Sequence, residues 1–235
     1  PRTTSEGVMS ESGLSASYEA FNCSMFPGWG GFGHTGPLYA GGHWDLTENQ
    51  MRWFCRTLGV MKEGARTRFL RGAHMPMMCG PGGFAFHPGH SFCILPAFEY
   101  QANGYASLSI ISHLHAMGWP REATEQLYEP LLEYAEFFRS LLTEVGGRLE
   151  QHHAPVHTMA ESNIFPEEHN LVDILAPAKG TFVFAERAAR QLGMSDAADR
   201  WSALAAKVDL SILRDPELGY LYAEGQRAFT SKLGA

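Results

Sequence analysis

The chain has 235 residues, of which 45% are hydrophobic, so it can bury a sizeable core. Its 18 Lys and Arg against 25 Asp and Glu give a net charge of −7, without a basic cluster interleaved with aromatic residues, which excludes nucleic acid as a partner. Every apolar run is interrupted well before the ~20 residues that cross a bilayer, so no membrane partner is expected.

The two ends of the chain suggest a piece of a longer protein. Residues 1–21 are polar and small, and we expect a loosely ordered lead-in there. One helical unit should occupy residues 22–235, and the remainder of a longer chain would be its partner. Four cysteines without CxxC spacing give no disulfide framework and leave the compartment open.

A glycine-rich stretch over residues 22–44 carries several aromatic side chains, including Trp29 and Trp44. This composition disfavours a helix and is typical of a loop. Aromatic residues on such a loop either stack on a flat ligand face or anchor the loop to a core. Both interpretations stay open at this point.

The first helix is predicted to begin near Glu48, because Thr47 and Gln50 have the spacing of a capping box. Trp44, Asp45 and Glu48 would then lie at or just before a helix N-terminus. A tryptophan face beside a carboxylate suits recognition of a sugar hydroxyl. The alternative is that these residues only stabilise the end of the helix.

A further helical stretch over residues 60–70 leads into a Gly/Pro-rich loop over residues 71–90. A loop this long in a compact domain is usually functional. Helix is expected again over residues 92–117, with Leu108, Ile111, Leu114 and His115 on one side. Gly118 should end it and Pro120 should begin the next helix, which predicts a helical hairpin.

The following helix has the clearest amphipathic pattern in the chain, formed by Leu127, Leu131, Tyr134, Phe138 and Leu141. Gly146 and Gly147 are expected to end it, and a third polar loop follows over residues 148–166.

The next helix should end at Leu192, with a break near Pro177, and Ser195 should cap the helix after it. The pattern therefore predicts an all-α fold in which helical hairpins alternate with long Gly/Pro-rich loops.

Glu161 is the candidate general acid, because it lies on a loop between the apolar residues Met159 and Ile164. Such surroundings can raise the pKa of a carboxyl group, as acid catalysis requires. A solvated loop glutamate is the alternative. Asp45 and Glu48 are the candidate partner carboxylates, and their separation from Glu161 would decide between retaining and inverting chemistry.

The histidine groups do not have the spacing of a closed zinc site, so no metal is predicted. These groups are His87 with His90, His113 with His115, and His152-His153 with His157. The sequence also contains no phosphate-binding loop, dinucleotide fingerprint or nucleophile elbow, and we expect no cofactor.

The order of these segments resembles the six-hairpin glycosidases with an (α/α)6 toroid, most closely the inverting α-L-fucosidases of glycoside hydrolase family 95. The motifs that carry the resemblance are Trp44-Asp45, Gln50-Met51 with Trp53, the stretch 127–138 and Ala160-Glu161-Ser162-Asn163. Leu46 and Glu48 stand where that family has two asparagines, and Ala160 stands where it has a proline. About six or seven helices are predicted, whereas a complete toroid has twelve. We therefore expect that this chain can form an incomplete toroid.

The resemblance implies a glycoside hydrolase that inverts configuration and acts on an oligosaccharide or polysaccharide, with an α-L-fucoside as one candidate. It implies Glu161 as the acid and a base that lies beyond this chain. The residues expected to contact the sugar are His43, Trp44, Asn49, Trp29, His87 and Asn163. A secreted or periplasmic location is favoured over a cytoplasmic one.

Three alternatives remain open. Trp44-Asp45 and the stretch 71–76 are also similar to segments of toroid maltose phosphorylases and trehalases, which suggests a sugar phosphorylase or a trehalase-like enzyme. The other two are a non-catalytic glycan-binding fragment and a helical scaffold whose aromatic residues are all structural.

Overall fold

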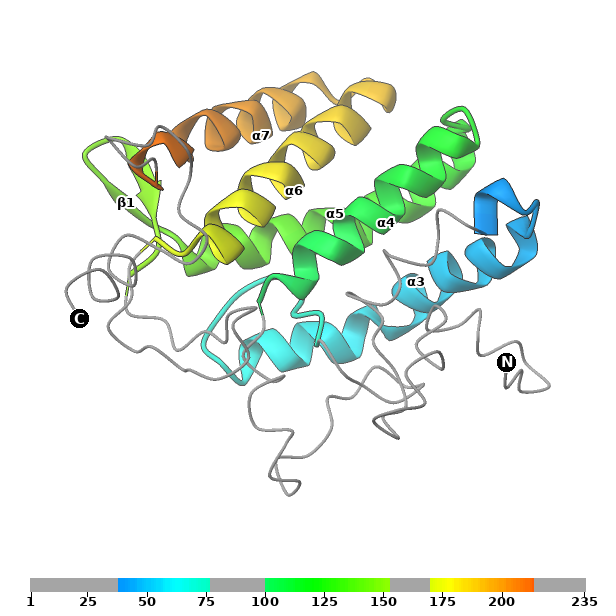
Figure 1. Cartoon of the computed structure of the whole chain (residues 1–235), viewed down its shortest axis with the longest axis horizontal. Coiled ribbons are helices and arrows are strands. Elements are labelled where there is room, and N and C mark those ends of the chain that lie inside the picture. Colours follow the sequence, from blue (N-terminus) through cyan, green and yellow to red (C-terminus); the bar gives the residue numbers. More distant parts are fainter. Residues whose placement is uncertain (1–37, 77–99, 153–169, 214–235) are drawn as a thin grey trace, which may run out of the picture.

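The computed structural model describes residues 38–76, 100–152 and 170–213 (Figure 1). Five long helices dominate this part of the chain: α3 (Trp44–Arg66), α4 (Ala102–Ala116), α5 (Arg121–Leu141), α6 (Val172–Gln191) and α7 (Ser195–Lys207). The remaining elements are the strands β1 (Thr143–Val145) and β2 (Arg148–Glu150) and the 3-10 helix η4 (Leu210–Leu213). Residues 38–40 are also helical, within a stretch whose composition disfavours a helix.

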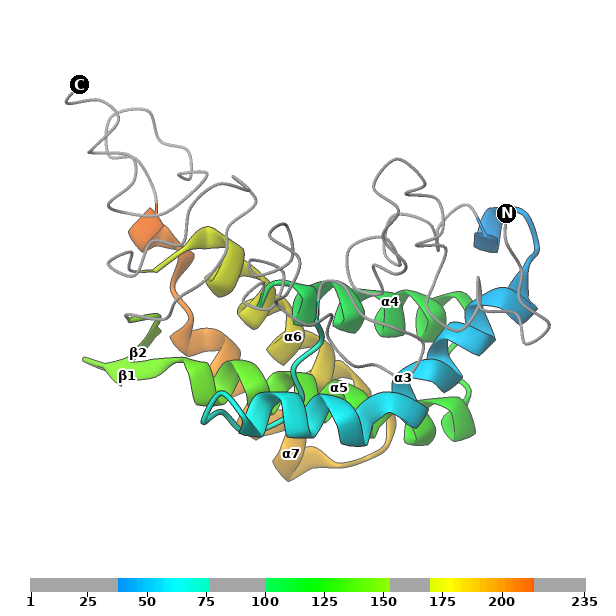
Figure 2. The same ribbon diagram turned by 90° about the horizontal axis from the view of Figure 1, so that it is seen from below.

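The helices form two layers. Figure 2 shows α4 and α6 in one layer and α3, α5 and α7 in the other. Helix α4 forms an antiparallel hairpin with α5, and α6 forms another with α7, so α4 and α6 run in the same direction (Figure 1). Repeated hairpins of this kind, with one layer of parallel helices inside an outer layer, build an (α/α) toroid.

The connections within each hairpin are short, whereas those between hairpins are long. Residues 117–120 join α4 to α5, and residues 192–194 join α6 to α7. By contrast, residues 67–101 separate α3 from α4, and residues 142–171 separate α5 from α6. Both long connections therefore lead to the N-terminal ends of α4 and α6, at the same end of the layer (Figure 1).

The predicted amphipathic helix is confirmed as α5. Its residues Leu127, Leu131, Tyr134 and Phe138 are buried against the neighbouring helices. Helix α4 is different, because its buried residues include Asn103, Ser107 and Ser109 as well as Ile111 and Leu114, and they surround most of the helix.

The hairpin predicted between α4 and α5 is confirmed. Gly118 has a φ of 74°, a left-handed conformation that ends a helix. Pro120 precedes α5 as its N-cap residue, one position earlier than expected. His115, predicted on the same side of the helix as Ile111 and Leu114, is exposed, whereas those two residues are buried.

The predicted start of the first helix is wrong. Helix α3 begins at Trp44, and the Thr47 hydroxyl donates a hydrogen bond back to the Trp44 carbonyl at 2.8 Å. Thr47 is thus inside the helix, and no side chain caps its N-terminus. The helix then continues without interruption to Arg66.

The predicted role of Gly146 and Gly147 is also wrong. Helix α5 ends earlier, at Leu141, and the two glycines form the turn between β1 and β2, with φ of 58° and 83°. Positive φ at both positions gives the turn type that suits a two-residue β-hairpin. Because β1 is exposed at every position, it has no alternating pattern by which the sequence could reveal it.

Pro177 does not break α6, which is continuous from Val172 to Gln191. It lies opposite Gly104 of α4, where an added Cβ would be only 2.3 Å from the Pro177 Cβ. The two inner helices therefore approach closely because Gly104 has no side chain. Ser195, the predicted cap of α7, is its first residue and makes no capping bond.

Gly104→Ala is expected to lower the free energy of unfolding by about 1–3 kcal/mol, because the methyl group would overpack the contact with Pro177. Gly59→Ala is the matched control, since Gly59 lies inside α3 with open space around it and alanine favours a helix by up to about 1 kcal/mol. Urea unfolding of both variants measures the difference. Equal effects of the two substitutions would contradict the close approach of α4 and α6.

Candidate functional site

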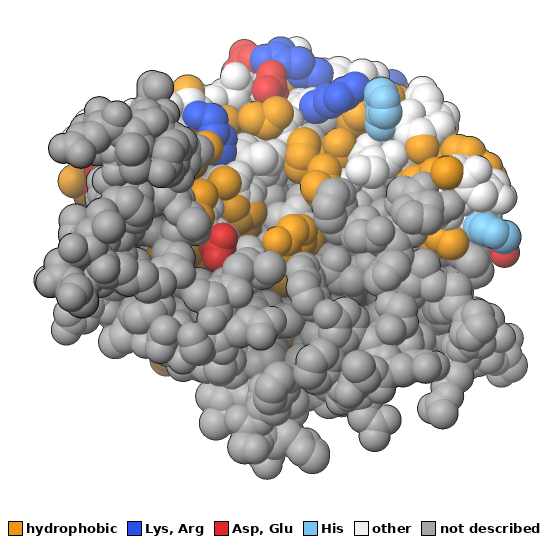
Figure 3. All heavy atoms as spheres, viewed as in Figure 1, with side chains coloured by type: hydrophobic (Ala, Val, Ile, Leu, Met, Phe, Trp, Pro, Cys, Tyr) orange, Lys and Arg blue, Asp and Glu red, His pale blue; other side chains and the backbone are white. Residues whose placement is uncertain are grey.

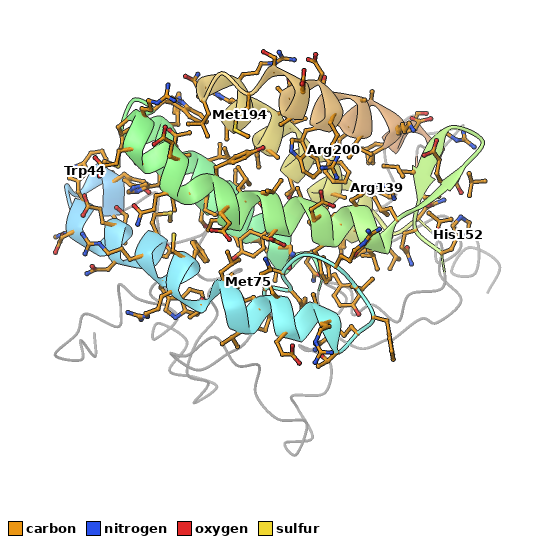
Figure 4. All side chains as sticks on the ribbon, turned by 180° about the vertical axis from the view of Figure 1, so that it is seen from behind. Trp44, Met75, Arg139, His152, Met194 and Arg200 are labelled. Atoms are coloured by element: carbon orange, nitrogen blue, oxygen red, sulfur yellow. The ribbon has the colours of Figure 1, made fainter. Side chains whose placement is uncertain are left out.

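The described residues present two candidate regions, one at each end of the helical layers. Figure 4 shows Trp44 and His152 at opposite ends of the molecule. Helix α4 has 15 residues, so its two ends lie about 22 Å apart. Residues held at opposite ends of α4 therefore cannot contact one small ligand together.

The N-terminal end of α3 contains all of the predicted site residues that the structure describes. His43, Trp44 and Asp45 are exposed, and the Trp44 ring lies 5.4 Å from the ring of Tyr39. Glu48 and Asn49 both accept hydrogen bonds from the Arg52 guanidinium, at 2.8 and 2.7 Å. These contacts lie at the surface, where a pair of this kind contributes little to stability.

A small cavity of about 170 Å³ lies beside this cluster, between α3, the C-terminal end of α4 and the first turns of α5. Its lining includes Glu48, Arg52 and His113. The hydroxyl of Tyr39 lies 3.0 Å from Nδ1 of His113. Burial lowers the pKa of His113 to about 4 and raises the pKa of Tyr39 to about 12. Both groups are therefore neutral near pH 7, and we assign the tyrosine as the donor and Nδ1 as the acceptor.

The other predicted site residues lie outside the described residues. They are Trp29, His87, Glu161 and Asn163. The chain that carries Glu161 and Asn163 leaves the described core at His152 and returns at Asn170, at the end of α6 away from Trp44 (Figures 1 and 4). The pairing of Glu161 with Asp45 or Glu48 stays a prediction.

The segment that matches the resemblance at Gln50, Met51 and Trp53 lies in the core. All three side chains are buried, and the ring of Trp53 has no exposed surface. This part of α3 packs toward α5 and supports the fold.

At the opposite end of α4, a buried asparagine holds the chain that precedes the stretch 77–99. The Asn103 side chain donates to the Ala73 carbonyl and accepts from the Met75 backbone N–H, both at 2.7 Å. We call this arrangement the Asn103 clamp. Because Asn103, Ala73 and Met75 are all buried, these bonds have no replacement from water.

Further contacts fix the same segment to α3 and α5. The Ala73 N–H donates to the Glu133 carbonyl, and the His74 N–H donates to the Met61 carbonyl. Gly72, at φ 77°, lies against the α5 backbone, where a Cβ would be 2.2 Å from the Glu133 oxygen. The His74 ring stacks on Phe137 at 5.3 Å, and burial, followed by the charge of Arg68, lowers its pKa well below the usual value.

A second clamp brackets the stretch 153–169. The Gln151 N–H donates to the Asn170 side-chain oxygen, and the Asn170 N–H donates to the Gln151 carbonyl. The Gln151 side chain also accepts from the Leu171 N–H at the start of α6, at 3.0 Å. We call this the Gln151–Asn170 clamp. It holds both ends of the chain that carries Glu161 next to the N-terminus of α6.

A larger cavity, of about 370 Å³, lies between α4 and α6. Its polar lining comes from Gln101 and Asp173, near the N-termini of the two helices, and its aromatic lining comes from Tyr105 and Phe184. The lining residues follow one face of each helix, away from the residues that α5 and α7 bury. Figure 3 shows hydrophobic side chains gathered over α4 and α6 on this face, with an acidic group among them.

The sequence analysis missed Gln101 and Asp173. The one available signal was an acidic residue in the first turn of the predicted helix after residue 171. Nothing in the sequence distinguishes Gln101 from the other residues of the predicted helix. Gln101 and Asp173 line the same cavity only because α4 packs against α6.

Among the residues that the structure describes, no three His, Cys, Asp or Glu side chains are close enough to hold a metal ion. Within the same ranges, no helix has the length and apolar character needed to cross a bilayer.

No protein-family model matches the chain, and no curated protein matches its sequence. A solved structure described as "Putative kojibiose phosphorylase from human microbiome" is similar to this chain with a TM-score of 0.62 and 14% sequence identity. The similarity covers 80% of this chain and 26% of that one, so the chain spans about a quarter of the length of the structure it matches. The predicted all-α toroid fold of helical hairpins is confirmed.

Asn103→Ala is expected to lower the free energy of unfolding by roughly 2–5 kcal/mol, because it leaves one buried carbonyl and one buried N–H unpaired. Ser107→Ala is the control, since the Ser107 hydroxyl donates only to a carbonyl of its own helix. Denaturant unfolding compares the two variants. A loss no larger than that of Ser107→Ala would show that the Asn103 clamp does not hold the segment.

The stability of the chain should fall as the pH is lowered from 6.5 toward 4. His113 has a depressed pKa in the folded state, so the unfolded chain binds a proton in this window that the folded chain does not. The expected slope from this residue is up to about 1.4 kcal/mol per pH unit.

His113→Gln should remove that part of the slope, while the contribution of His74 remains. His115→Gln, an exposed position on the same helix, is the control and should keep the full slope. Urea unfolding across this pH window makes the comparison, and identical slopes for wild type and His113→Gln would contradict the prediction.

Proposed function

We propose that this chain is part of the catalytic toroid of a carbohydrate-active enzyme, a sugar phosphorylase that cleaves an oligosaccharide by inversion. The observation that carries the proposal is the convergence of features at one end of α4 and α6. Both clamps lie there, each at the edge of a long connection, and the larger cavity opens beside them. Loops mounted on rigid helices around a cavity are a common setting for binding and catalysis.

The fold likeness to a kojibiose phosphorylase supports this choice among the reactions that toroid enzymes perform. In phosphorolysis, a phosphate oxygen attacks the anomeric carbon from the face opposite the leaving group. The bond from that carbon to the glycosidic oxygen breaks, and Glu161 donates a proton to the leaving oxygen. The products are a sugar 1-phosphate of inverted configuration and the shortened sugar.

Phosphate is already an anion at neutral pH, so this reaction needs an acid but no carboxylate base. That requirement agrees with the position of Asp45 and Glu48, which lie at the other end of α4 from the Gln151–Asn170 clamp. Under this proposal these two residues contact neither the acid nor the attacking phosphate.

An inverting glycoside hydrolase, including an α-L-fucosidase, is the second candidate. The motif Ala160-Glu161-Ser162-Asn163 favours it, because it resembles the general-acid loop of that family. Water would replace phosphate, and a carboxylate base would have to lie about 6.5–9.5 Å from the acid.

The deciding assay supplies kojibiose, related gluco-disaccharides and an α-L-fucoside to the longest gene product that carries this chain, with and without inorganic phosphate. We expect a sugar 1-phosphate that forms only when phosphate is present. Free monosaccharide released at the same rate without phosphate would favour the hydrolase. A protein that neither turns over nor binds any of these sugars would contradict both.

Glu161→Gln should lower kcat/KM by at least about 100-fold, because it removes the proton donor for the leaving oxygen. Glu167→Gln is the matched control, a change of the same kind in the same stretch of chain. Equal activity of the Glu161→Gln variant and wild type would exclude Glu161 as the acid.

A further inference from the structure

The side-chain amide of Gln101 is buried without a hydrogen-bond partner among the described residues. Gln101 is only 4% exposed, and neither its amide nitrogen nor its amide oxygen is bonded. Leaving both atoms unpaired in the interior costs free energy, so such groups require an explanation. Because Gln101 lines the cavity between α4 and α6, a ligand in that cavity could supply the missing partners.

Asp173 adds a carboxylate to the lining of the cavity. It lies in the first turn of α6, so the cavity has a carboxylate together with an amide that both donates and accepts. A carboxylate has about four lone-pair sites and can accept hydrogen bonds from hydroxyl groups. The polar lining therefore suits a ligand that carries several hydroxyls.

The rest of the lining fits the apolar faces of such a ligand. Tyr105 and Phe184 contribute aromatic surface, and Leu108 and Pro177 contribute aliphatic surface. The volume of about 370 Å³ is at the lower end of small-molecule sites. A sugar ring combines hydroxyls on its rim with C–H groups on its faces, and it matches both kinds of surface.

We propose that this cavity is a subsite for one neutral pyranose ring, in which Gln101 and Asp173 bind the hydroxyls and Phe184 packs against a ring face. The identity of the ligand rests on the proposed function, whereas the location rests on the unpaired amide and the cavity. Phosphate and the reacting bond would lie outside this subsite.

Gln101→Met tests the assignment, because methionine keeps the length of the side chain but removes both polar atoms. The probes are D-glucose and kojibiose, titrated calorimetrically into the 235-residue chain. We expect at least tenfold weaker binding together with a higher melting temperature, since the unpaired amide is gone. A purely structural Gln101 would give a lower melting temperature and unchanged binding.

Asp173→Asn is the second variant, and it decides the question if Gln101→Met does not fold. It should also weaken binding, by removing the charged acceptor. Gln191→Met is the matched control, because Gln191 is exposed at the far end of α6, and it should bind as wild type does.

The outcomes separate this inference from the proposed function. If wild type binds glucose or kojibiose and both cavity variants bind equally well, the subsite lies elsewhere and the proposed function stands. If wild type binds neither sugar, the inference is overturned. If the gene product that carries the chain also turns over no sugar, the proposed function falls with it.

Discussion

The requirement that buried backbone groups be hydrogen-bonded controls how this chain is arranged. Where the long connections meet the helices, no regular structure can pair those groups, and side-chain amides do so instead. Asn103 pairs the backbone on both sides of His74, while Gln151 and Asn170 pair each other's backbone across the stretch 153–169. The ends of both connections are consequently fixed to the N-termini of α4 and α6.

This arrangement places the short turns and the long connections at opposite ends of the helices. The short turns 117–120 and 192–194 close the hairpins at one end, with left-handed Gly118 and Gly193 ending α4 and α6. The long connections are held at the other end, beside the cavity that Gln101 and Asp173 line. Connections held in this way can vary without disturbing the hairpins, and the hairpins form the (α/α) fold that the similar solved structure shares over 80% of this chain.

The sequence predicted those features that depend on neighbours along the chain. The amphipathic pattern of α5 and the glycine that ends α4 are local signals, and they were sufficient for the first hairpin and the all-α class. The predicted start of α3 was wrong, because the Thr47 hydroxyl bonds to a carbonyl within the helix, which is an alternative to capping that the spacing alone does not exclude. Asn103, Gln101 and Asp173 could not be found from the sequence. Asn103 acts through bonds to Ala73 and Met75, about 30 residues away, and Gln101 and Asp173 line one cavity from two different helices. The pairing of Glu161 with Asp45 or Glu48 stays a prediction, because Glu161 lies outside the described residues.

If a sugar binds at the N-terminal end of α4 and α6, an NMR titration of the labelled chain with D-glucose will locate it there. The side-chain amide signals of Gln101 and the backbone signals around Asp173 should shift with one saturable dissociation constant. The backbone signals around Trp44 and Glu48 should stay in place. Shifts confined to the Trp44 end, with Gln101 unaffected, would exclude this site and place sugar binding at the start of α3.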